Sequence, residues 1–296
     1  MSIRVGTRGS RLALAQTDTV CNKLAALGIK VERKIITTQG DTVTNVPLHE
    51  IGKQGVFVRA LDDAILAGEI DCAVHSMKDI PAYRPSGLFT AAVLERDSPA
   101  DFFACAGTPD AAKIIGTSST RRKAQLLRHR QDLVIKDLRG NVDTRIRKMH
   151  AGEYDAIILA EAGLTRLGME IPGERLPPET FVPSPNQGTI AVVSRADPSL
   201  MEMLSAVDHP VSRTDVAMER AVMEQVGAGC FTPMGIYCKA GHLIAEVLSL
   251  DGRQVERIET DITTIDEART QGRLLRARAQ GLIDEAYKTL GISYER

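Results

Sequence analysis

The sequence predicts an α/β protein made of two similar sheet domains and a smaller C-terminal domain. In the first hundred residues, short runs rich in β-branched residues alternate with runs of helical spacing. Two short motifs from this region recur in the same order further along the chain. After residue 208, three strand-like runs follow one another with glycine between them, a pattern that favours an antiparallel sheet.

The first hundred residues are predicted to form one sheet and its helices. Strands are expected at 3–5, 31–37, 72–74 and 89–94, and helices at 12–27 and 58–66. Gly28 ends the first helix, because glycine is common just past a helix end. The polar segment 38–54 is predicted to be a long loop. This alternation indicates a largely parallel sheet.

A repeated pair of motifs indicates that the next part of the chain has the same topology. The segment VGTRGS at 5–10 resembles IGTSST at 115–120, and GEID at 68–71 resembles GEYD at 152–155. Because the spacing differs, we expect shared topology and not a strict repeat. The Gly-Thr turns then lie at the carboxyl ends of strands, where open α/β sheets bind ligands. Two such edges facing each other would form a cleft with helix N-termini on both walls.

The rest of the chain is predicted to complete the first domain and add a third. Prolines break the pattern between 171 and 188, and a strand at 189–193 with a helix at 200–207 returns to the first domain. A helix follows from 210 to 226, then strands at 234–239, 243–249 and 254–261. Thr264 and Glu267 form a capping box for a last helix that ends at Gly291. The predicted domains are 1–96 with 189–207, 97–188, and 208–296.

The composition is that of a soluble globular protein. Hydrophobic residues make up 43% and charged residues 25%, with no tryptophan, so the core should be mostly aliphatic. We expect no secretory signal, and no apolar run is long enough to span a membrane. The five cysteines are scattered and form no C-x-x-C pair, which indicates reduced thiols, no structural metal and a cytoplasmic location.

The segment 116–148 concentrates positive charge. It holds ten Lys or Arg against three Asp, in a chain whose net charge is −1. A solvated helix face is one interpretation of such a run. Its position favours another, because the hydroxyl residues 117–119 follow a strand and open a helix, where backbone N–H groups bind anions. Arg121 and Arg122 fall in the first helical turn, where the dipole disfavours cations, so a bound carboxylate or phosphate is predicted to compensate.

Asp79 is the catalytic candidate that the sequence favours. It lies in HSMKDIP at 75–81, after a buried strand and before a proline-limited turn, and loops at the ends of central strands often carry function. A turn aspartate that caps the local backbone is the alternative. Lys78 is interpreted as a salt-bridge partner or as a contact to phosphate or carboxylate, and His75 as a satisfied core residue.

Cys230 is the cysteine with an unusual context. It lies between Gly-Ala-Gly and Phe-Thr-Pro, whereas Cys21 and Cys72 lie on apolar runs and are predicted to be buried as small hydrophobic residues. Both a reactive and an inert thiol are consistent with the Cys230 context. In the second half of the basic segment, Arg139 at a strand end is favoured for ligand contact, while an exposed helix face also explains Arg145.

Six segments, in order along nearly the whole chain, resemble the motifs of the porphobilinogen deaminases, also called hydroxymethylbilane synthases. The segments are GTRGSRLALAQ (6–16), AVHSMKDIP (73–81), GTSSTRRKAQL (116–126), LRGNVDTR (138–145), GEYDAIILAEAGLTRLG (152–168) and GAGCFTPMG (227–235). The combination of the HSMKDIP, GTSSxRR and LRGN motifs is highly specific for this family.

The resemblance implies a three-domain fold. Two periplasmic-binding-protein-like (type II) α/β domains form a cleft, and a small C-terminal α+β domain with a three-stranded antiparallel sheet carries a dipyrromethane cofactor. The family joins four porphobilinogen molecules head to tail with release of ammonia, and water then frees hydroxymethylbilane for tetrapyrrole (haem) biosynthesis. Because each pyrrole bears two carboxylates, a growing chain needs many arginines. A carboxylate in a basic cleft can stabilise cationic, azafulvene-like species and manage protons.

The resemblance also implies roles for individual residues. Asp79 matches the catalytic carboxylate, and Cys230 matches the thioether attachment point of the dipyrromethane cofactor. The residues that match contacts to this cofactor are Lys78, Thr117, Ser119, Arg121 and Arg122. Those that match contacts to porphobilinogen, to the growing chain or to the neighbourhood of the active site are Arg8, Ser10, Gln16, Phe57, Arg139, Arg145 and Arg166. We expect a monomer with no nucleic-acid, membrane or metal partner.

The chain departs from the family pattern at three places. GKQGV at 52–56 stands where many members have G-K-G before the Phe, which leaves the role of Lys53 open. PNQG at 185–188 replaces a more usual V-G-Q-G, which leaves the hinge open, and Gly-Ala-Gly precedes Cys230 where Gly-Gly is common.

Two other functions compete with this one. A non-catalytic anion-binding protein with the same two-domain fold needs neither Asp79 nor a reactive Cys230. A nucleic-acid binder is disfavoured, because aromatic residues are only 4% and the net charge is near zero. If the enzyme is correct, Asp79→Asn should cut turnover, and Arg122→Ala should weaken cofactor assembly more than stability.

Overall fold

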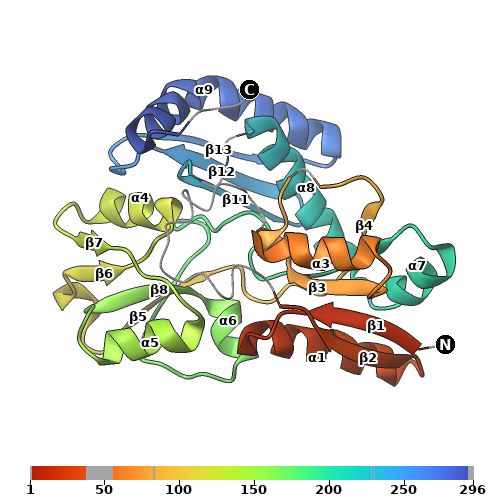
Figure 1. Cartoon of the computed structure of the whole chain (residues 1–296). Helices are drawn as coiled ribbons and strands as arrows, with labels where there is room; N and C mark the ends of the chain where they lie inside the picture. Colours follow the sequence, from red (N-terminus) through yellow and green to blue (C-terminus); the bar gives the residue numbers. More distant parts are fainter. Residues whose placement is uncertain (1, 38–55, 83, 228, 230, 293–296) are drawn as a thin grey trace. The chain divides into compact units, whose positions relative to one another are not determined.

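The computed structural model describes residues 2–37, 56–82, 84–227, 229 and 231–292, without the side chains of Val56 and Phe57. The chain divides into two compact units (Figure 1). The first comprises Met1–Asp97, Arg166–Gly168 and Gly188–Thr214, and the second comprises Ser98–Thr165, Met169–Gln187 and Asp215–Arg296. The predicted loop at 38–54 lies outside the described residues, and the three-domain boundaries remain a prediction.

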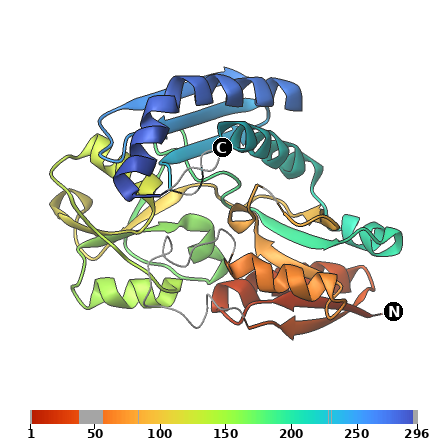
Figure 2. The same ribbon diagram turned by 45° about the horizontal axis from the view of Figure 1, so that its top comes forward.

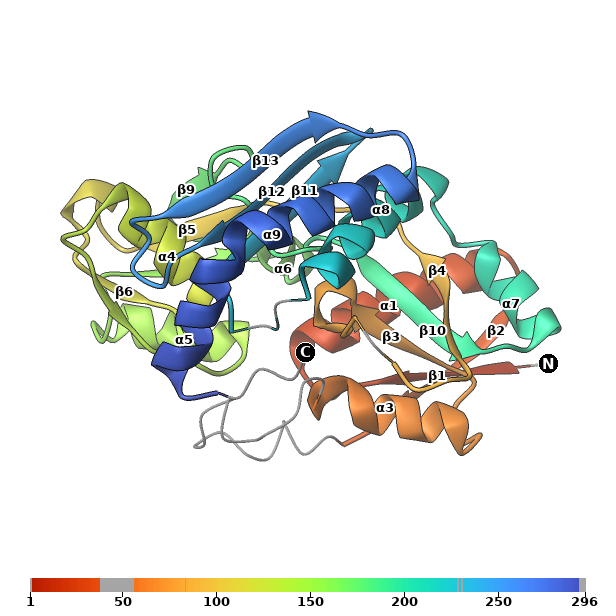
Figure 3. The same cartoon turned by 90° about the horizontal axis from the view of Figure 1, so that it is seen from above.

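The first unit is built on a five-stranded sheet with the strand order β2-β1-β3-β10-β4. Its strands are β1 (Ser2–Thr7), β2 (Lys30–Ile35), β3 (Cys72–Ser76), β4 (Leu88–Val93) and β10 (Ile190–Arg195). β1 is parallel to β2 and β3, whereas β10 lies antiparallel between β3 and β4 (Figure 3). The helices of this unit are α1 (Arg11–Ala26), α3 (Val56–Leu66) and α7 (Pro198–Ser205). Its core is aliphatic, as the composition predicted.

The second unit contains a sheet with the same topology, in the order β7-β6-β8-β5-β9. Its strands are β5 (Asp101–Cys105), β6 (Ile114–Gly116), β7 (Val134–Lys136), β8 (Ala156–Ala160) and β9 (Gly173–Leu176). β6 is parallel to β7 and β8, and β5 is the antiparallel strand. Helices α4 (Thr120–His129), α5 (Val142–His150) and α6 (Glu161–Arg166) connect the strands. Two sheets of this order are the type II periplasmic-binding-protein-like arrangement, so the predicted fold class is confirmed.

The repeated motifs occupy equivalent positions in the two sheets. In the first sheet Val5 is paired with Cys72, and in the second Ile115 is paired with Ala156. Each pair joins the strand before a Gly-Thr turn to the strand after a GEID or GEYD motif. The prediction of shared topology is therefore confirmed at the level of strand register.

Glycine is required at the start of each Gly-Thr turn because a larger residue would clash with a neighbouring side chain. A Cβ atom at Gly6 would lie 2.3 Å from Cδ1 of Ile70, and one at Gly116 would lie 2.8 Å from Cδ1 of Tyr154. Ile70 and Tyr154 are the third residues of the GEID and GEYD motifs. The two sheets therefore use the same close packing of a motif side chain against a strand backbone.

A separate three-stranded antiparallel sheet forms the C-terminal part of the second unit. It consists of β11 (Met234–Lys239), β12 (His242–Leu248) and β13 (Val255–Asp261), and it packs with α8 (Pro210–Val226) and α9 (Ile265–Leu290) around one apolar core. Figure 2 shows α9 lying along this sheet. The predicted capping box is confirmed, since the Thr264 hydroxyl accepts from the backbone N–H of Glu267 at 3.1 Å. Gly291, with a φ of 66°, ends α9.

The sequence did not predict two strands, and both lie in the second sheet. β9 falls in the proline-rich segment that was predicted to break the pattern; it is an edge strand with Pro172 and Pro177 just outside it, where proline removes no ladder hydrogen bond. β5 begins with the charged residue Asp101, which obscured its apolar character. The sheets are mixed and not purely parallel, because β5 and β10 run against their neighbours.

Candidate active site

The candidate catalytic aspartate lies on a short turn at the end of β3. This strand is buried up to His75, and a single 3-10 turn, Met77–Asp79, follows it. The backbone N–H of Met77 donates to the carbonyl oxygen of Thr189 at 2.9 Å, and that of Ile80 donates to the carbonyl oxygen of Met77 at 3.1 Å. These bonds fix the turn on the sheet while Asp79 itself is exposed, so its carboxylate is accessible to a ligand.

The turn between β1 and α1 carries further predicted residues. Arg8 and Ser10 are half-buried there, and the Ser10 hydroxyl caps α1 by accepting from the backbone N–H of Ala13 at 3.4 Å. Gln16 is buried on α1, with its Nε2 atom 2.8 Å from Oγ of Ser76 at the end of β3. Because β1 and β3 are parallel neighbours, these residues lie at the same sheet edge as the turn that carries Asp79.

His75 is buried as predicted, but it is not fully satisfied. Its Nε2 atom has no hydrogen-bond partner within the described ranges. Burial, together with the charges of Arg84 and Arg8, lowers the pKa of His75 to about 3, so the ring is neutral near pH 7. Arg84 forms a buried ion pair with Asp62 of α3. The prediction was therefore right about burial and wrong about hydrogen bonding.

In the second unit, the turn between β6 and α4 carries the hydroxyl residues of the GTSS motif. Thr117 is buried, and its Oγ1 accepts from the backbone N–H of Ser119 at 3.2 Å. The Ser119 hydroxyl caps α4 by accepting from the backbone N–H of Arg122 at 3.4 Å. The helix start that the sequence predicted is thus confirmed, with Ser119 as its N-cap.

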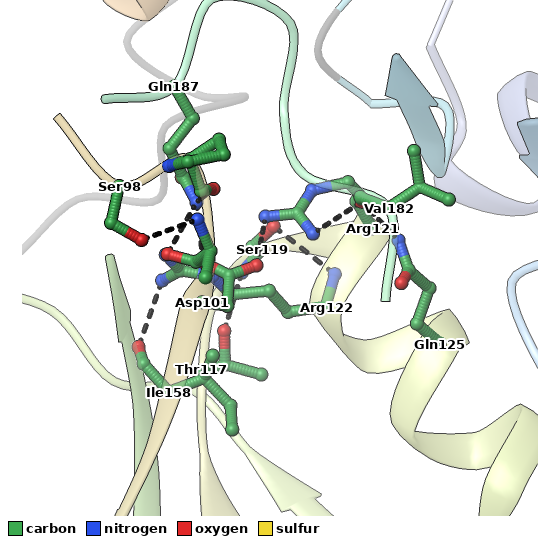
Figure 4. A network of polar contacts seen from close by, with 12 residues as sticks. Ser98, Asp101, Thr117, Ser119, Arg121, Arg122, Gln125, Ile158, Val182 and Gln187 are labelled. Atoms are coloured by element: carbon green, nitrogen blue, oxygen red, sulfur yellow. Dashed lines mark hydrogen bonds and ion pairs between the residues drawn. The ribbon is translucent and has the colours of Figure 1, made fainter. Parts of the chain in front are cut away.

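Arg121 and Arg122 share one buried carboxylate, that of Asp101 (Figure 4). Nη2 of Arg121 lies 2.7 Å from Oδ2, and Nη2 and Nε of Arg122 lie 2.7 and 3.2 Å from Oδ1. The guanidinium-bearing residues are 5% and 7% exposed, and Asp101 is fully buried. The carboxylate that the paired arginines predicted is therefore supplied, in part, by the chain itself.

The charge of this cluster does not balance. Burial raises the pKa of Asp101, but the two guanidinium groups outweigh it and hold the pKa well below its usual range, so the carboxylate is ionised. Burial lowers the pKa of Arg121, and Asp101 counteracts part of that effect. Two cations and one anion leave an excess positive charge in a buried position, which favours the binding of a further anion.

Three more predicted arginines have defined surroundings. Arg139 is half-buried just after β7, and Gly140 beside it has a φ of 109°. Arg145 of α5 donates from Nε to the carbonyl oxygen of Gly140 at 2.7 Å. Arg166 donates from Nε to Oδ2 of Asp97 at 2.8 Å and from Nη2 to the carbonyl oxygen of Gly188 at 2.5 Å. Burial lowers the pKa of Arg166, and Asp97 counteracts it.

Two predicted residues fall outside the described side chains. Cys230 is not among the described residues, and Phe57 belongs to α3 without a described side chain. The residues next to Cys230 are anchored: the backbone N–H of Gly229 donates to the Tyr287 hydroxyl at 3.0 Å, and that of Thr232 donates to the carbonyl oxygen of Gly229 at 3.1 Å. The four described cysteines, including the fully buried Cys72, carry free thiols.

The structure therefore gathers the predicted residues into two sets. The set in the first unit is Arg8, Ser10, Gln16, Lys78, Asp79 and Arg166, and the set in the second unit is Thr117, Ser119, Arg121, Arg122, Arg139 and Arg145. Sequence reasoning missed Asp101 and Gln187, which bind the arginine pair or its carboxylate. They are remote from the basic segment in sequence, and no local pattern marks them.

The described residues were also searched for metal-binding clusters and for helices that could span a membrane. Within 2–37, 56–82, 84–227, 229 and 231–292, no group of three or more His, Cys, Asp or Glu side chains is placed to hold a metal ion. Among the helices of those residues, none is long and apolar enough to cross a bilayer. Each unit carries hydroxyl residues at a helix start together with predicted arginines, and groups of these kinds are suited to bind carboxylates.

Comparison with known proteins identifies the family. A family model described as "Porphobilinogen deaminase, dipyromethane cofactor binding domain" matches residues 3–203, and one described as "Porphobilinogen deaminase, C-terminal domain" matches residues 214–280. The chain is 50% identical over 299 residues to the probable porphobilinogen deaminase of Methanosarcina acetivorans, covering 95% of this chain and 94% of that one. It is 46% identical to the porphobilinogen deaminase of Rubrobacter xylanophilus, with 80% of each chain covered. The chain belongs to the porphobilinogen deaminase family, and the resemblance is confirmed.

Proposed function

We propose that this chain is a transferase that joins four porphobilinogen molecules head to tail and yields hydroxymethylbilane for tetrapyrrole biosynthesis. The observation that carries the proposal is the buried arginine pair with its single carboxylate. Each pyrrole ring of the substrate bears two carboxylates, so a site with an excess of guanidinium groups suits it. The family membership supports the same reaction.

Each addition needs one bond to break and one to form. The bond between the aminomethyl carbon of porphobilinogen and its nitrogen breaks with loss of ammonia, and that carbon joins the α-carbon of the acceptor pyrrole, which then loses its proton. Positive charge develops on the incoming ring when ammonia leaves. Asp79 is exposed on a turn fixed to the sheet, so its carboxylate is suited to accept a pyrrole N–H and stabilise that charge.

The dipyrromethane cofactor suits the predicted cofactor contacts, all of which except Lys78 and Cys230 were described above in the second unit. When bound, it supplies a pyrrole carbon to which the first substrate adds. We assign its covalent attachment to Cys230, as a thioether. Its carboxylates would be held by Arg121 and Arg122, with Lys78, Thr117 and Ser119 as further contacts, because these residues offer guanidinium, ammonium, hydroxyl and helix N-terminal groups.

The substrate and the growing chain would be bound by the remaining basic and polar residues. These are Arg8, Ser10, Gln16, Phe57, Arg139, Arg145 and Arg166. Arg166 already pairs with Asp97, so a substrate carboxylate would have to compete with that aspartate or share the guanidinium with it. We further propose that the enzyme works as a monomer in the cytoplasm.

The first experiment is the intact mass of freshly purified protein from a host that makes haem. Wild type and Cys21→Ser, which alters a partly exposed cysteine of α1, should both carry extra mass equal to two linked pyrrole units. Cys230→Ser should lack it. An adduct that survives in Cys230→Ser would overturn the attachment site. Absence of an adduct in wild type, with no consumption of added porphobilinogen, would overturn the enzyme and favour a non-catalytic anion-binding protein.

A further inference from the structure

Asp101 is the centre of the buried network around the arginine pair (Figure 4). It is the first residue of β5 and is fully buried. Besides the two arginines, it accepts from Nε2 of Gln187 on Oδ1 at 2.9 Å. The same amide nitrogen lies 2.8 Å from the carbonyl oxygen of Pro99. Three side chains, two from the start of α4 and one from residue 187, thus fix one carboxylate.

Each guanidinium group is held from two sides. Arg121 donates from Nη1 to the carbonyl oxygen of Val182 at 3.0 Å, and Arg122 donates from Nη1 to that of Ile158 at 2.9 Å. Both groups also bind Asp101. These contacts engage two N–H groups of Arg121 and three of Arg122, out of the five that a guanidinium offers. Each arginine therefore has N–H groups that these contacts do not engage.

The Asp101 carboxylate does not only neutralise charge; it also keeps the two guanidinium groups together. One anion between two cations still leaves an excess positive charge. Glu246, a buried acid whose charge also acts on Arg121, is itself paired with Arg128 and Arg257. Without Asp101, the two guanidinium groups would repel each other across a buried site and separate. Their separation would destroy any bidentate arrangement that a carboxylate ligand requires.

We propose that Asp101 is the positioning residue of the cofactor-binding arginines: it holds Arg121 and Arg122 so that their remaining N–H groups bind carboxylates of the dipyrromethane cofactor. This inference rests on the proposed function of the same site. Gln187 acts on the arginines indirectly, because its amide holds the carboxylate of Asp101, which in turn holds the arginines. Asp101 touches neither the reacting atoms nor the cofactor in this role.

The test uses full-length Asp101→Asn, which keeps the shape of the side chain and removes its charge. The matched control is Asp71→Asn, since Asp71 also bridges two arginines, Arg4 and Arg195, but lies in the first unit at the start of β3. Both variants lose one arginine-bound carboxylate. The measurements are the cofactor-loaded fraction by intact mass, the thermal midpoint, and kcat per loaded molecule.

The expected result separates positioning from stability. Because the guanidinium groups would bind the cofactor through charged hydrogen bonds, each typically worth about tenfold or more, we expect the ratio of loaded to unloaded protein to fall at least about tenfold in Asp101→Asn. Asp71→Asn should be less stable than wild type yet fully loaded. The loss of kcat per loaded molecule in Asp101→Asn should be smaller than the loss of loading, since Asp101 does not contact the reacting bond. Full loading of a folded Asp101→Asn, or an equal loss in Asp71→Asn, would overturn the proposal.

A second variant decides the matter if Asp101→Asn does not fold. Gln187→Ala keeps all three charges and removes the amide that binds Asp101 and the carbonyl oxygens of Pro99 and Ala100. We expect a folded protein with a reduced loaded fraction, and unchanged loading there would contradict the proposal. The wild type distinguishes this failure from that of the proposed function. A loaded, active wild type beside fully loaded variants refutes only the role of Asp101, whereas an unloaded wild type that consumes no porphobilinogen refutes the function itself.

Discussion

Asp155 in the second sheet makes the same backbone contacts as Asp71 in the first. Oδ2 of Asp71 accepts from the backbone N–H of Arg4 at 2.7 Å, and the Asp71 N–H donates to the Arg4 carbonyl oxygen at 2.9 Å. Oδ2 of Asp155 accepts from the backbone N–H of Ile114 at 2.7 Å, and the Asp155 N–H donates to the Ile114 carbonyl oxygen at 2.9 Å. The final aspartate of each GEID or GEYD motif thus joins the starts of two parallel strands.

Asp71→Asn should lower the free energy of unfolding by about 1.5 kcal/mol at pH 7, because hydrogen bonds to charged groups contribute about this much. Burial raises the pKa of Asp71, but hydrogen bonds from the side chain and backbone of Arg4 outweigh it, and the net pKa is lowered. The stabilisation is therefore present above the unfolded pKa and lost as the pH falls through the folded one. Urea unfolding at pH 7 and pH 3 checks this, and a difference between wild type and variant that does not shrink at pH 3 would contradict it.

Asp79→Asn should leave the fold intact and reduce kcat by about 10²–10⁴-fold, the usual contribution of a catalytic proton-transfer group. Asp79 is exposed, so its replacement removes no buried contact. Initial rates of porphobilinogen consumption at saturating substrate, with the circular dichroism spectrum, test the prediction. Asp63→Asn changes an exposed aspartate of α3 and serves as the control, with wild-type rates expected. Near-normal turnover in Asp79→Asn would exclude the catalytic assignment.

His75 should make the protein less stable in mild acid. Burial lowers its pKa to about 3 from an ordinary value of 6.5, so between these values the unfolded chain binds a proton that the folded one does not. Stability therefore falls as the pH falls through this window, by about 1.6 kcal/mol from pH 6.5 to 5, because the slope approaches about 1.4 kcal/mol per pH unit only below the unfolded pKa. His75→Gln, whose amide stays neutral, should lose less over this range. The measurement is urea unfolding at both pH values.

His242 provides a control of opposite sign for this measurement. Hydrogen bonds to Asp261 and Glu259 raise its pKa, so its stabilising effect is present below the unfolded pKa and is lost as the pH rises. His242→Gln should therefore steepen the loss of stability between pH 6.5 and 5, whereas His75→Gln should make it shallower. Equal pH dependence in wild type and His75→Gln would show that His75 takes up its proton over the same pH range in the folded and the unfolded protein, which would contradict the lowered pKa.

Much of the fold could be predicted because its signals are local. The helix from Pro210, the capping box at Thr264 and the C-terminal meander depend on neighbouring residues, and all three are confirmed. The repeated motifs also predicted equivalent strands, because each contains a glycine that the packing requires. The strands β5 and β9 were missed because pairing partners distant in sequence, and not their own composition, make them strands.

In the candidate site, too, features with a local signal could be predicted, and contacts between residues distant in sequence could not. The N-cap role of Ser119 could be predicted from its place between a strand and a helix. The anion beside Arg121 was also predicted, but not that Asp101, twenty residues earlier, supplies part of it. That knowledge changes one expectation: removing Arg122 leaves Asp101 partly unpaired in a buried position, so Arg122→Ala should cost stability as well as cofactor assembly.

Asn186 should tolerate glycine better than alanine. Its φ is 64°, in the left-handed region, and its Oδ1 has no hydrogen-bond partner within the described residues although the residue is buried. Its backbone N–H donates to Oε2 of Glu219 at 2.5 Å, which holds the conformation in place. Asn186→Gly removes both the conformational cost and the unpaired oxygen, whereas Asn186→Ala adds about 1–2 kcal/mol of backbone strain. Urea unfolding should therefore rank Gly above Ala by about 1 kcal/mol, after allowance for the greater freedom of unfolded glycine.

Thr214, exposed in helix α8, is the control and should show the reverse ranking, because alanine is favoured over glycine in a helix. An Ala variant at 186 as stable as the Gly variant would mean that the backbone there relaxes out of the left-handed region.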